Sequence, residues 1–451
     1  MMNSLQEKCA VVGVYGVPNS SIYAYYALFS MQHRGQEASG ISSANKQRLY
    51  TIKDRGLVTS IFTDDKLKTL QGDNAIGHNR YSTAGEDSIL DAQPVFARYD
   101  LGEMAIVHNG NLTNAKKIRD ELIQNGAIFQ SFMDTENLIH LIAKSQKPKL
   151  LDRVVDAIKK IEGAYSLVIM SRNKMFAIRD PYGFRPLSLA KLKDGYIVAS
   201  ETCAFDLVGA EFIRDVEPGE MLVFERDKEP KSYKLYEPTP KKCIFEYIYF
   251  ARPDSSVFGQ NVYEARKRLG EELASEYPVE ADMVVPVPDS GISAALGYSK
   301  ASGIPFELGI IRNHYVGRTF IEPLQQSRET KVKMKLSPIK EVIKGKKLVI
   351  IDDSIVRGTT SRSIVRMLKD AGAKEVHVRI SAPPTISPCY YGVDTPSKEE
   401  LISAGSTASE VANFIEADSL SFLSIEGMNR AIGNEAEYCK ACFDGEYFHE
   451  S

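Results

Sequence analysis

Cys9 is the first residue of this 451-residue chain whose position could serve chemistry. A polar leader, MMNSLQEK, runs directly into it, and the apolar string AVVGVYG follows. If the leader stays attached, Cys9 is expected to be a small buried core residue. If a peptide bond is cut before Cys9, the thiol gains its own α-amino group, whose pKa of roughly 7.7–8.0 suits a base for the nucleophile. The position alone leaves both interpretations open.

A second chemical pattern is the string KLVIIDDSIVRGTTSRSIV, in which an apolar strand ends in Asp352 and Asp353. The loop after it would aim N–H groups and hydroxyls at an anion, where the dipole of the next helix also favours negative charge. The residues that would do so are Gly358, Thr359, Thr360 and Ser361. Two carboxylates directly before an anion site suit ribose hydroxyls or a Mg²⁺ ion. A plain strand-to-helix turn with capping residues is the alternative, and the length of the complete string disfavours it.

Four of the six cysteines form a third pattern. Cys439-x-x-Cys442, together with Cys243 and Cys389, supplies four thiolates, which could hold tetrahedral Zn²⁺ or an iron–sulfur cluster. Unligated thiols are the third possibility. The leader lacks the basic start and apolar core of an export signal, so a cytoplasmic location and reduced thiols are expected.

The elements around these residues change in character along the chain. Up to about residue 235, short β-like runs alternate with turns and a few helices such as residues 115–124, which predicts an α+β region. Residues 236–242, with two prolines, are typical of a linker. Beyond them, apolar strands alternate with helices, which predicts a doubly wound parallel sheet. The helices are expected at 261–277, 361–372 (ending at Gly372) and between the strands at 281–290 and 346–354, and another strand is expected at 375–381.

Length and charge limit the classes of function. A chain of this length exceeds a single hydrophobic core, so two or three domains are expected. The net charge is −3 with mixed signs, so the composition indicates no strongly basic surface that would bind nucleic acid or a membrane. No apolar run approaches the roughly 20 residues that span a bilayer.

The D-D-S-x-x-x-G-T-T string resembles the signature of the type I phosphoribosyltransferases, and PVPDSGISAALGY resembles their pyrophosphate loop. The resemblance implies binding of phosphoribosylpyrophosphate, with Mg²⁺ at Ser290, Asp352 and Asp353. The implied ligand-binding residues are Asp352, Asp353, Ser354, Arg357, Gly358, Thr359, Thr360, Ser361, Asp289, Ser290, Gly291 and Arg318. Arg318 belongs to a long cationic stretch, residues 310–336, which reads as a solvated loop or, by resemblance, as a lid over the substrate.

The first half resembles the N-terminal-nucleophile (Ntn) glutamine amidotransferases in five strings: CAVVGVYG, MQHRGQEASGI, GHNRYSTAG, IVHNGNLTN and FMDTENL. The resemblance implies that Cys9 attacks the glutamine amide and that Asn109 and the N–H of Gly110 form the oxyanion hole. It also implies that Arg80 binds the glutamine α-carboxylate and Asp134 its α-ammonium, with Arg34 supporting the Cys9 region. One departure is Asn79, which stands where this group commonly has an apolar residue.

Both halves in this order resemble the glutamine phosphoribosylpyrophosphate amidotransferase family, in its iron–sulfur branch with a propeptide. That resemblance implies an Ntn glutaminase domain at 9–235 after a propeptide at 1–8, a linker at 236–260, and a phosphoribosyltransferase domain at 261–451 with a cluster-binding tail. Glutamine hydrolysed at Cys9 would supply ammonia, through a sealed passage, to displace pyrophosphate and give phosphoribosylamine for purine synthesis. The resemblance favours a [4Fe–4S] cluster on Cys243, Cys389, Cys439 and Cys442, with Mg²⁺ as the second cofactor.

Partners and rival functions complete the prediction. The resemblance implies feedback inhibition by purine nucleotides and a homotetramer. One rival is a regulator that senses phosphoribosylpyrophosphate without catalysis, which would need none of the glutamine-site residues. Another is a sugar-phosphate aminotransferase with the same glutaminase domain, which the D-D-S-x-x-x-G-T-T string disfavours.

Overall fold

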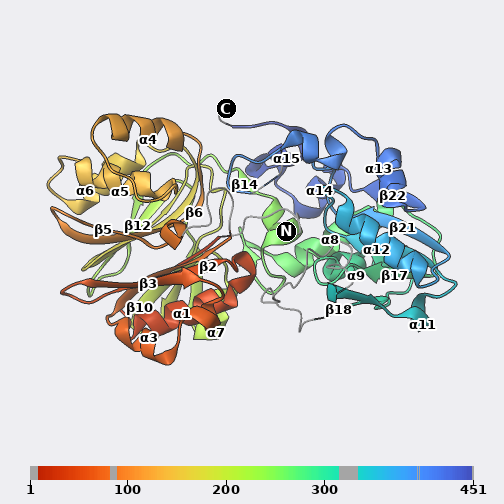
Figure 1. Ribbon diagram of the computed structural model, residues 1–451, viewed down its shortest axis with the longest axis horizontal. Helices are drawn as coiled ribbons and strands as arrows, with labels where there is room; N and C mark the ends of the chain where they lie inside the picture. Colours follow the sequence, from red (N-terminus) through yellow and green to blue (C-terminus); the bar gives the residue numbers. More distant parts are fainter. Residues whose placement is uncertain (1–8, 82–88, 314–333, 394, 396, 449–451) are drawn as a thin grey trace.

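The computed structural model describes residues 9–81, 89–313, 334–393, 395 and 397–448, which form two regions lying side by side (Figure 1). The leader at 1–8 and Arg318 lie outside these residues, as does most of the stretch predicted as a lid. Within the described part of the chain, no helix combines the length and apolar character needed to cross a membrane.

The first region consists of two antiparallel sheets. In order across it, the first sheet comprises β11 (Glu211–Asp215), β9 (Ser188–Leu192), β10 (Gly195–Ala199), β1 (Ala10–Tyr15), β4 (Asn74–Arg80), β2 (Ala38–Ala44) and β3 (Leu49–Arg55). The second comprises β13 (Lys231–Lys234), β12 (Glu220–Glu225), β8 (Lys174–Arg179), β7 (Gly163–Ser171), β6 (Gly102–Leu112) and β5 (Val95–Tyr99).

Helices cover the outer faces of both sheets, so the region has four layers (Figure 1). Helices α1 (Ser20–Ser30) and α7 (Cys203–Val208) pack on the first sheet, and α4 (Ala115–Gln124), α5 (Thr135–Lys144) and α6 (Leu150–Ile158) pack on the second. Strand β1 is apolar throughout because Val11 lies in the core between the sheets, whereas its neighbour Val12 packs toward α1. The predicted α+β architecture is confirmed, and Cys203 is buried in the core of this region.

The second region contains a parallel sheet of β17 (Met283–Pro286), β20 (Lys347–Asp352), β21 (Glu375–Ile380) and β22 (Ser419–Phe422). Helices α8 (Val262–Glu276), α9 (Ile292–Ser302) and α14 (Ile425–Ile432) pack on one face, and α12 (Thr359–Asp370) and α13 (Ala408–Ile415) on the other. The predicted doubly wound sheet is therefore confirmed. Gly372, with φ of +96°, follows the last turn of α12 in the left-handed conformation that ends many helices.

A segment between the regions joins them to the end of the chain. Strand β14 (Lys242–Cys243) pairs in parallel with β23 (Tyr438–Cys439), and the short helix α15 (Ala441–Asp444) follows β23. The π-helix η3 (Glu246–Phe250) comes next after β14, and its Tyr247 and Phe250 are buried in the core of the second region. Much of the predicted linker is thus a packed part of the structure.

Candidate functional site

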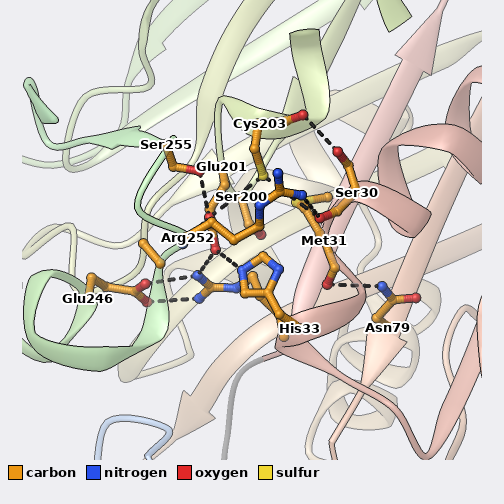
Figure 2. A network of polar contacts seen from close by, with 12 residues as sticks. Ser30, Met31, His33, Asn79, Ser200, Glu201, Cys203, Glu246, Arg252 and Ser255 are labelled. Atoms are coloured by element: carbon orange, nitrogen blue, oxygen red, sulfur yellow. Dashed lines mark hydrogen bonds and ion pairs between the residues drawn. The ribbon is translucent and has the colours of Figure 1, made fainter. Parts of the chain in front are cut away.

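Cys9 lies half-buried directly before β1, and a buried arginine holds its main chain. The Cys9 carbonyl oxygen accepts a hydrogen bond from Arg34 Nε at 3.0 Å. The two Nη atoms of Arg34 each lie 2.8 Å from a carboxylate oxygen of Glu246, and Nη1 lies 2.6 Å from Glu201 Oε1 (Figure 2). Burial opposes the charge of Arg34, but Glu246 and Glu201 raise its pKa above the ordinary value. The predicted support of Cys9 by Arg34 therefore has a direct contact in the structure.

Glu201 is the centre of this network and is fully buried. Its carboxylate contacts His33 Nε2 at 2.8 Å and accepts hydrogen bonds from Ser255 Oγ at 2.7 Å and from the Arg252 N–H at 2.9 Å (Figure 2). Burial would raise the pKa of Glu201, but His33 and Arg34 hold it well below its ordinary value. Because Ser255 and Arg252 come from the segment after η3, the network ties the Cys9 region to the second half of the chain.

Arg80 lies at the end of β4, next to Cys9. Ala10 pairs with Asn79 in the antiparallel register of β1 and β4, so the next pair along is Cys9 with Arg80. The Arg80 side chain is buried, and its Nη2 lies 4.0 Å from Asp91 Oδ2. Asn79 Nδ2 donates a hydrogen bond at 2.7 Å to the Leu28 carbonyl, which lies in the last turn of α1. The polar side chain of Asn79 is thus accommodated by buried hydrogen bonds.

Asp134 is the residue directly before α5, and its carboxylate lies beside β6. Its Oδ2 accepts a hydrogen bond from the Leu112 N–H at 2.9 Å, and its Oδ1 lies 3.3 Å from His108 Nδ1. Burial would raise the pKa of Asp134, but His108 and these hydrogen bonds keep it below the ordinary value. The carboxylate is therefore charged and available to an ammonium group.

Asn109 and Gly110 are neighbours on β6, between His108 and Leu112. Asn109 is 2% exposed, and its side-chain Nδ2 has no hydrogen-bond partner within the described residues. Gly110 has φ of +144°, and a Cβ there would lie 2.1 Å from the Ala164 carbonyl oxygen, so only glycine fits. His78 of β4 reaches the His108 carbonyl at 3.1 Å and links this strand to the Cys9 sheet.

The second candidate site lies at the carboxyl ends of β17 and β20, as predicted for an open parallel sheet. The Val287 N–H donates to the Ile351 carbonyl at 2.9 Å, and a Cβ on Gly291 would lie 2.3 Å from that oxygen. The turn that carries Asp289 and Ser290 therefore lies directly beside the end of β20. Burial and the neighbouring Asp353 raise the pKa of Asp352 well above its ordinary value.

The predicted phosphate loop leads into α12. Gly358 is the residue before the helix, with φ of +71°, and Thr359 is the first helical residue, followed by Thr360 and Ser361. Arg357, just before them, pairs with Glu400. Ser354 Oγ donates to the Asp353 carboxylate. On the other side, Arg312 pairs with Asp289.

The four predicted cluster ligands lie together between the two regions. Cys243 and Cys439 are paired in the parallel register of β14 and β23. The Ile386 N–H donates to the Cys442 carbonyl at 2.9 Å, and Cys389 Sγ accepts from the Tyr391 N–H at 3.3 Å. Each of the four thiols lies within electrostatic range of the other three. Burial raises the pKa of the Cys243 thiol to about 12, although the positive charge of Arg185 opposes this shift.

Sequence reasoning missed Glu246, Glu201 and Arg185, which connect these parts. Arg185 is 1% exposed and pairs with Glu246 at 3.2 Å. The local sequence did hold one signal, which concerns Glu246. Glu246 is the lone acidic residue in the aromatic run IFEYIYF, and a carboxylate in such a run has to be buried with a cationic partner.

Two family models match the chain. One, described as a glutamine amidotransferase domain, matches residues 78–206. The other, described as a phosphoribosyl transferase domain, matches residues 258–406.

Similar curated proteins cover nearly the whole chain. Amidophosphoribosyltransferase 1, chloroplastic, of Arabidopsis thaliana is 51% identical over 98% of this chain and 79% of its own length. The amidophosphoribosyltransferase of Bacillus subtilis is 49% identical over 99% of this chain and 95% of its own. That of Methanothermobacter thermautotrophicus is 46% identical over 99% and 95%.

Solved structures agree with these matches. One, titled as the structure of the allosteric regulatory enzyme of purine biosynthesis, has a TM-score of 0.94 and 49% identity, and covers 98% of this chain and 96% of its own. Another is glutamine phosphoribosylpyrophosphate amidotransferase from B. subtilis complexed with ADP and GMP, with a TM-score of 0.93, 48% identity and 98% coverage of both chains.

Proposed function

Because the chain belongs to the amidophosphoribosyltransferase family, we propose a specific role for each residue of its two sites. An enzyme of this family transfers the amide nitrogen of glutamine to phosphoribosylpyrophosphate, which releases glutamate and pyrophosphate and gives phosphoribosylamine. The match spans both halves, including the glutamine half that a regulator without catalysis would not need. We retain the predicted divisions at residues 8, 235 and 260 as part of this proposal.

In the glutamine half, Cys9 is the nucleophile. Removal of residues 1–8 frees the α-amino group of Cys9, which then accepts the thiol proton. The thiolate attacks the glutamine amide carbon, and the oxyanion that forms takes hydrogen bonds from Asn109 Nδ2 and the Gly110 N–H. Ammonia leaves, and water hydrolyses the thioester to glutamate. The single observation that best supports this role is the buried Asn109 Nδ2, which finds no acceptor among the described residues, because a buried donor without an acceptor is costly unless a ligand supplies one.

Two charged groups orient the glutamine. Arg80, in the pair position next to Cys9, binds the α-carboxylate, and the charged Asp134 binds the α-ammonium. Arg34 acts behind them by holding the Cys9 carbonyl. Together these three residues fix the amide carbon near the Cys9 sulfur. Holding the two reacting groups in this geometry speeds the reaction relative to an encounter in free solution.

In the second half, the phosphate loop at Ser354 and Arg357–Ser361 and the Asp289–Gly291 turn hold the phosphoribosyl substrate. Asp352 and Asp353, with Ser290, are the residues that would hold Mg²⁺. The raised pKa of Asp352 supports this role, since two adjacent carboxylates that are buried together need a cation to be charged at the same time. When bound, Mg²⁺ supplies positive charge to the departing pyrophosphate. A role for Arg318 stays a prediction, because Arg318 lies outside the described residues.

The four-cysteine set fits an iron–sulfur cluster better than a single zinc ion. Zinc bound at about 2.3 Å would bring its four sulfurs within about 4 Å of one another. Among the described residues, which include all four cysteines, no group of three or more His, Cys, Asp or Glu side chains is arranged to hold a metal ion. A [4Fe–4S] cluster takes one thiolate on each iron and so needs a wider set. The Arg185 Nε also stays without a partner among the described residues, as expected if an acceptor from outside the chain completes it.

We also propose that purine nucleotides inhibit the enzyme and that it forms a homotetramer. The B. subtilis relative complexed with ADP and GMP supports nucleotide binding. Passage of ammonia between the sites is supported by the chemistry, since free ammonia in water at neutral pH becomes unreactive ammonium. A cytoplasmic location stays a prediction, and the A. thaliana relatives are named as chloroplastic.

Substitution of Cys9→Ala tests the proposed function. We expect loss of glutamine-dependent pyrophosphate release and retention of the rate with ammonium salts, because ammonia bypasses the thiol. Cys203→Ala, which removes a core thiol, is the control and should keep both activities. N-terminal sequencing of the same samples shows whether the chain starts at Cys9. Glutamine-dependent turnover by Cys9→Ala, or full activity with the leader attached, would contradict the proposal.

A further inference from the structure

The segment from Cys389 to Gly392 rests directly on the strand that carries the oxyanion-binding residues. Asn111 Nδ2, one residue past Gly110, donates to the Tyr390 carbonyl at 2.9 Å. A Cβ on Gly392 would lie 3.0 Å from both the Cα and the carbonyl carbon of Gly110. Gly392 has φ of +90°, in the region that favours glycine. The two glycine backbones are therefore in van der Waals contact across the boundary between the two regions.

Arg185 connects this segment to the residues that support Cys9. Its Nη2 donates to the Gly392 carbonyl, and its Nη1 lies 3.2 Å from Glu246 Oε1. The Glu246 carboxylate also accepts hydrogen bonds from the two Nη atoms of Arg34, whose Nε donates to the Cys9 carbonyl. A single buried guanidinium therefore contacts both the segment beneath Gly110 and the carboxylate that fixes Arg34.

The same guanidinium lies at the edge of the cysteine set. The Cys243 N–H donates to the carbonyl of Phe184 at 3.0 Å, directly before Arg185. Phe184 and Tyr391 stack with ring centroids 4.3 Å apart, and both pack with Cys439 and Cys389. Arg185 also keeps one buried donor, Nε, for which the described residues offer no acceptor.

We propose that Arg185 and the Cys389–Gly392 segment are positioning elements, through which occupancy of the cysteine set controls the geometry of the glutamine site. This inference rests on the proposed roles of Gly110 and of the four cysteines. With a cluster bound, Cys389 is fixed and its segment presses on Gly110. When the cluster is lost, the segment gains freedom, and a displacement of about 1 Å at an oxyanion donor can cost roughly 100-fold in rate. Glutamine chemistry then falls while ammonia-dependent transfer is spared.

The main test is Gly392→Ala, with labelling of Cys9 by a diazoketone analogue of glutamine as the readout. We expect labelling and glutamine-dependent turnover to slow roughly 10- to 100-fold, with the ammonia-dependent rate and the iron and sulfide content unchanged. Gly405→Ala is the matched control, because a Cβ at Gly405 would meet no atom within 4 Å and its φ is ordinary. The control should match the wild type in all four measurements.

Arg185→Lys is a second variant that keeps the positive charge but loses the fork of donors. It should slow Cys9 labelling in the same direction, whereas Arg379→Lys, at another buried arginine in β21, should not. Removal of iron from the wild type with a chelator should slow labelling to the rate of Gly392→Ala. Removal of iron from the Gly392→Ala variant should slow Cys9 labelling little further, because two disruptions of one connection are not additive.

The possible results separate this inference from the function on which it rests. If wild-type Cys9 is not labelled at all, the proposed function fails. If wild-type Cys9 is labelled and both Gly392→Ala and Arg185→Lys are labelled at the same rate, the proposed coupling is wrong and the proposed function stands. Equal losses of labelling and of ammonia-dependent transfer in both variants would also overturn the coupling, because they indicate general misfolding.

Discussion

The proposed glutamine site and the proposed phosphoribosyl site differ in how their buried charges are compensated. Around Cys9, the charged groups behind the substrate position already have partners, as with Arg34 between Glu201 and Glu246. At the end of β20, Asp352 and Asp353 lie next to each other, and the pKa of Asp352 is raised as a result. The first site therefore has internal partners for its buried charges, whereas the paired carboxylates of the second suit the cation proposed to bind there.

This difference follows from what each reaction needs. In the proposed mechanism, attack by a thiolate depends on fixed hydrogen-bond donors, which this chain would supply and support from behind. Displacement of pyrophosphate creates negative charge, which the proposed metal ion would help to neutralise. Substitutions at the two sites should consequently have different signatures.

The largest expected effect is at the phosphoribosyl site, with Asp353→Asn. Removing one of two carboxylates weakens cation binding, so pyrophosphate release should fall roughly 1,000-fold or more with either glutamine or ammonia. Labelling of Cys9 by the glutamine analogue should not change. Asp370→Asn, at the exposed end of α12, serves as the control. A loss confined to the glutamine-dependent reaction would break the comparison.

At the glutamine site, Asn109→Ala should produce the opposite pattern. Loss of one oxyanion donor is expected to lower glutamine-dependent turnover by about 100- to 1,000-fold, while the ammonia-dependent rate stays near that of the wild type. Asn125→Ala, on the exposed end of α4, is the control and should retain both rates. Equal turnover of glutamine by Asn109→Ala and wild type would remove Asn109 from the oxyanion hole.

Asn79→Leu tests the scaffold of the first region alone. It leaves the Leu28 and Met31 carbonyls without the donor they have now, which should cost about 1–3 kcal/mol of unfolding free energy. The apparent Tm of the first region should fall in calorimetry, with no shift for the second. An unchanged or higher Tm would show that the apolar residue common at this position packs well enough to compensate.

The smallest expected effect is a pH dependence from His78. Burial, followed by the charge of Arg80, lowers the pKa of His78 to about 3, whereas an unfolded histidine titrates near 6.5. Between these values the unfolded chain binds more protons, so stability rises with pH and falls as pH drops below about 6.5. From pH 6.5 to 5.5, His78 should cost about 1 kcal/mol or less of stability. His78→Gln should flatten the fall of Tm in that range, and an identical slope would rule this source out.

Much of the fold was predictable because its strands are buried on both faces. Continuous apolar runs such as AVVGVY and KLVIID specify strands with little competition, and the turn chemistry at Gly372 specifies a helix end. For the candidate sites, Cys9, Asn109 and the DDS string were predicted because each belongs to a string that resembles a known family, and their roles stay predictions.

The connections between the sites were not predictable in the same way. Arg185, Glu246 and Arg34 are far apart in sequence, and only the docking of the two regions brings them into one network. The contact between Gly392 and Gly110 leaves no pattern in either local sequence, because a glycine fits many turns. Long-range pairings of this kind depend on the tertiary structure, not on local periodicity.

The pairing of β14 with β23 has a consequence for the order of events during synthesis. Cys439 leaves the ribosome long after Cys243, so an unfinished polypeptide can fold its first sheets but cannot yet present a full set of thiols to iron. Insertion of the proposed cluster would thereby be a late step of maturation, and a prematurely stopped translation product would be colourless.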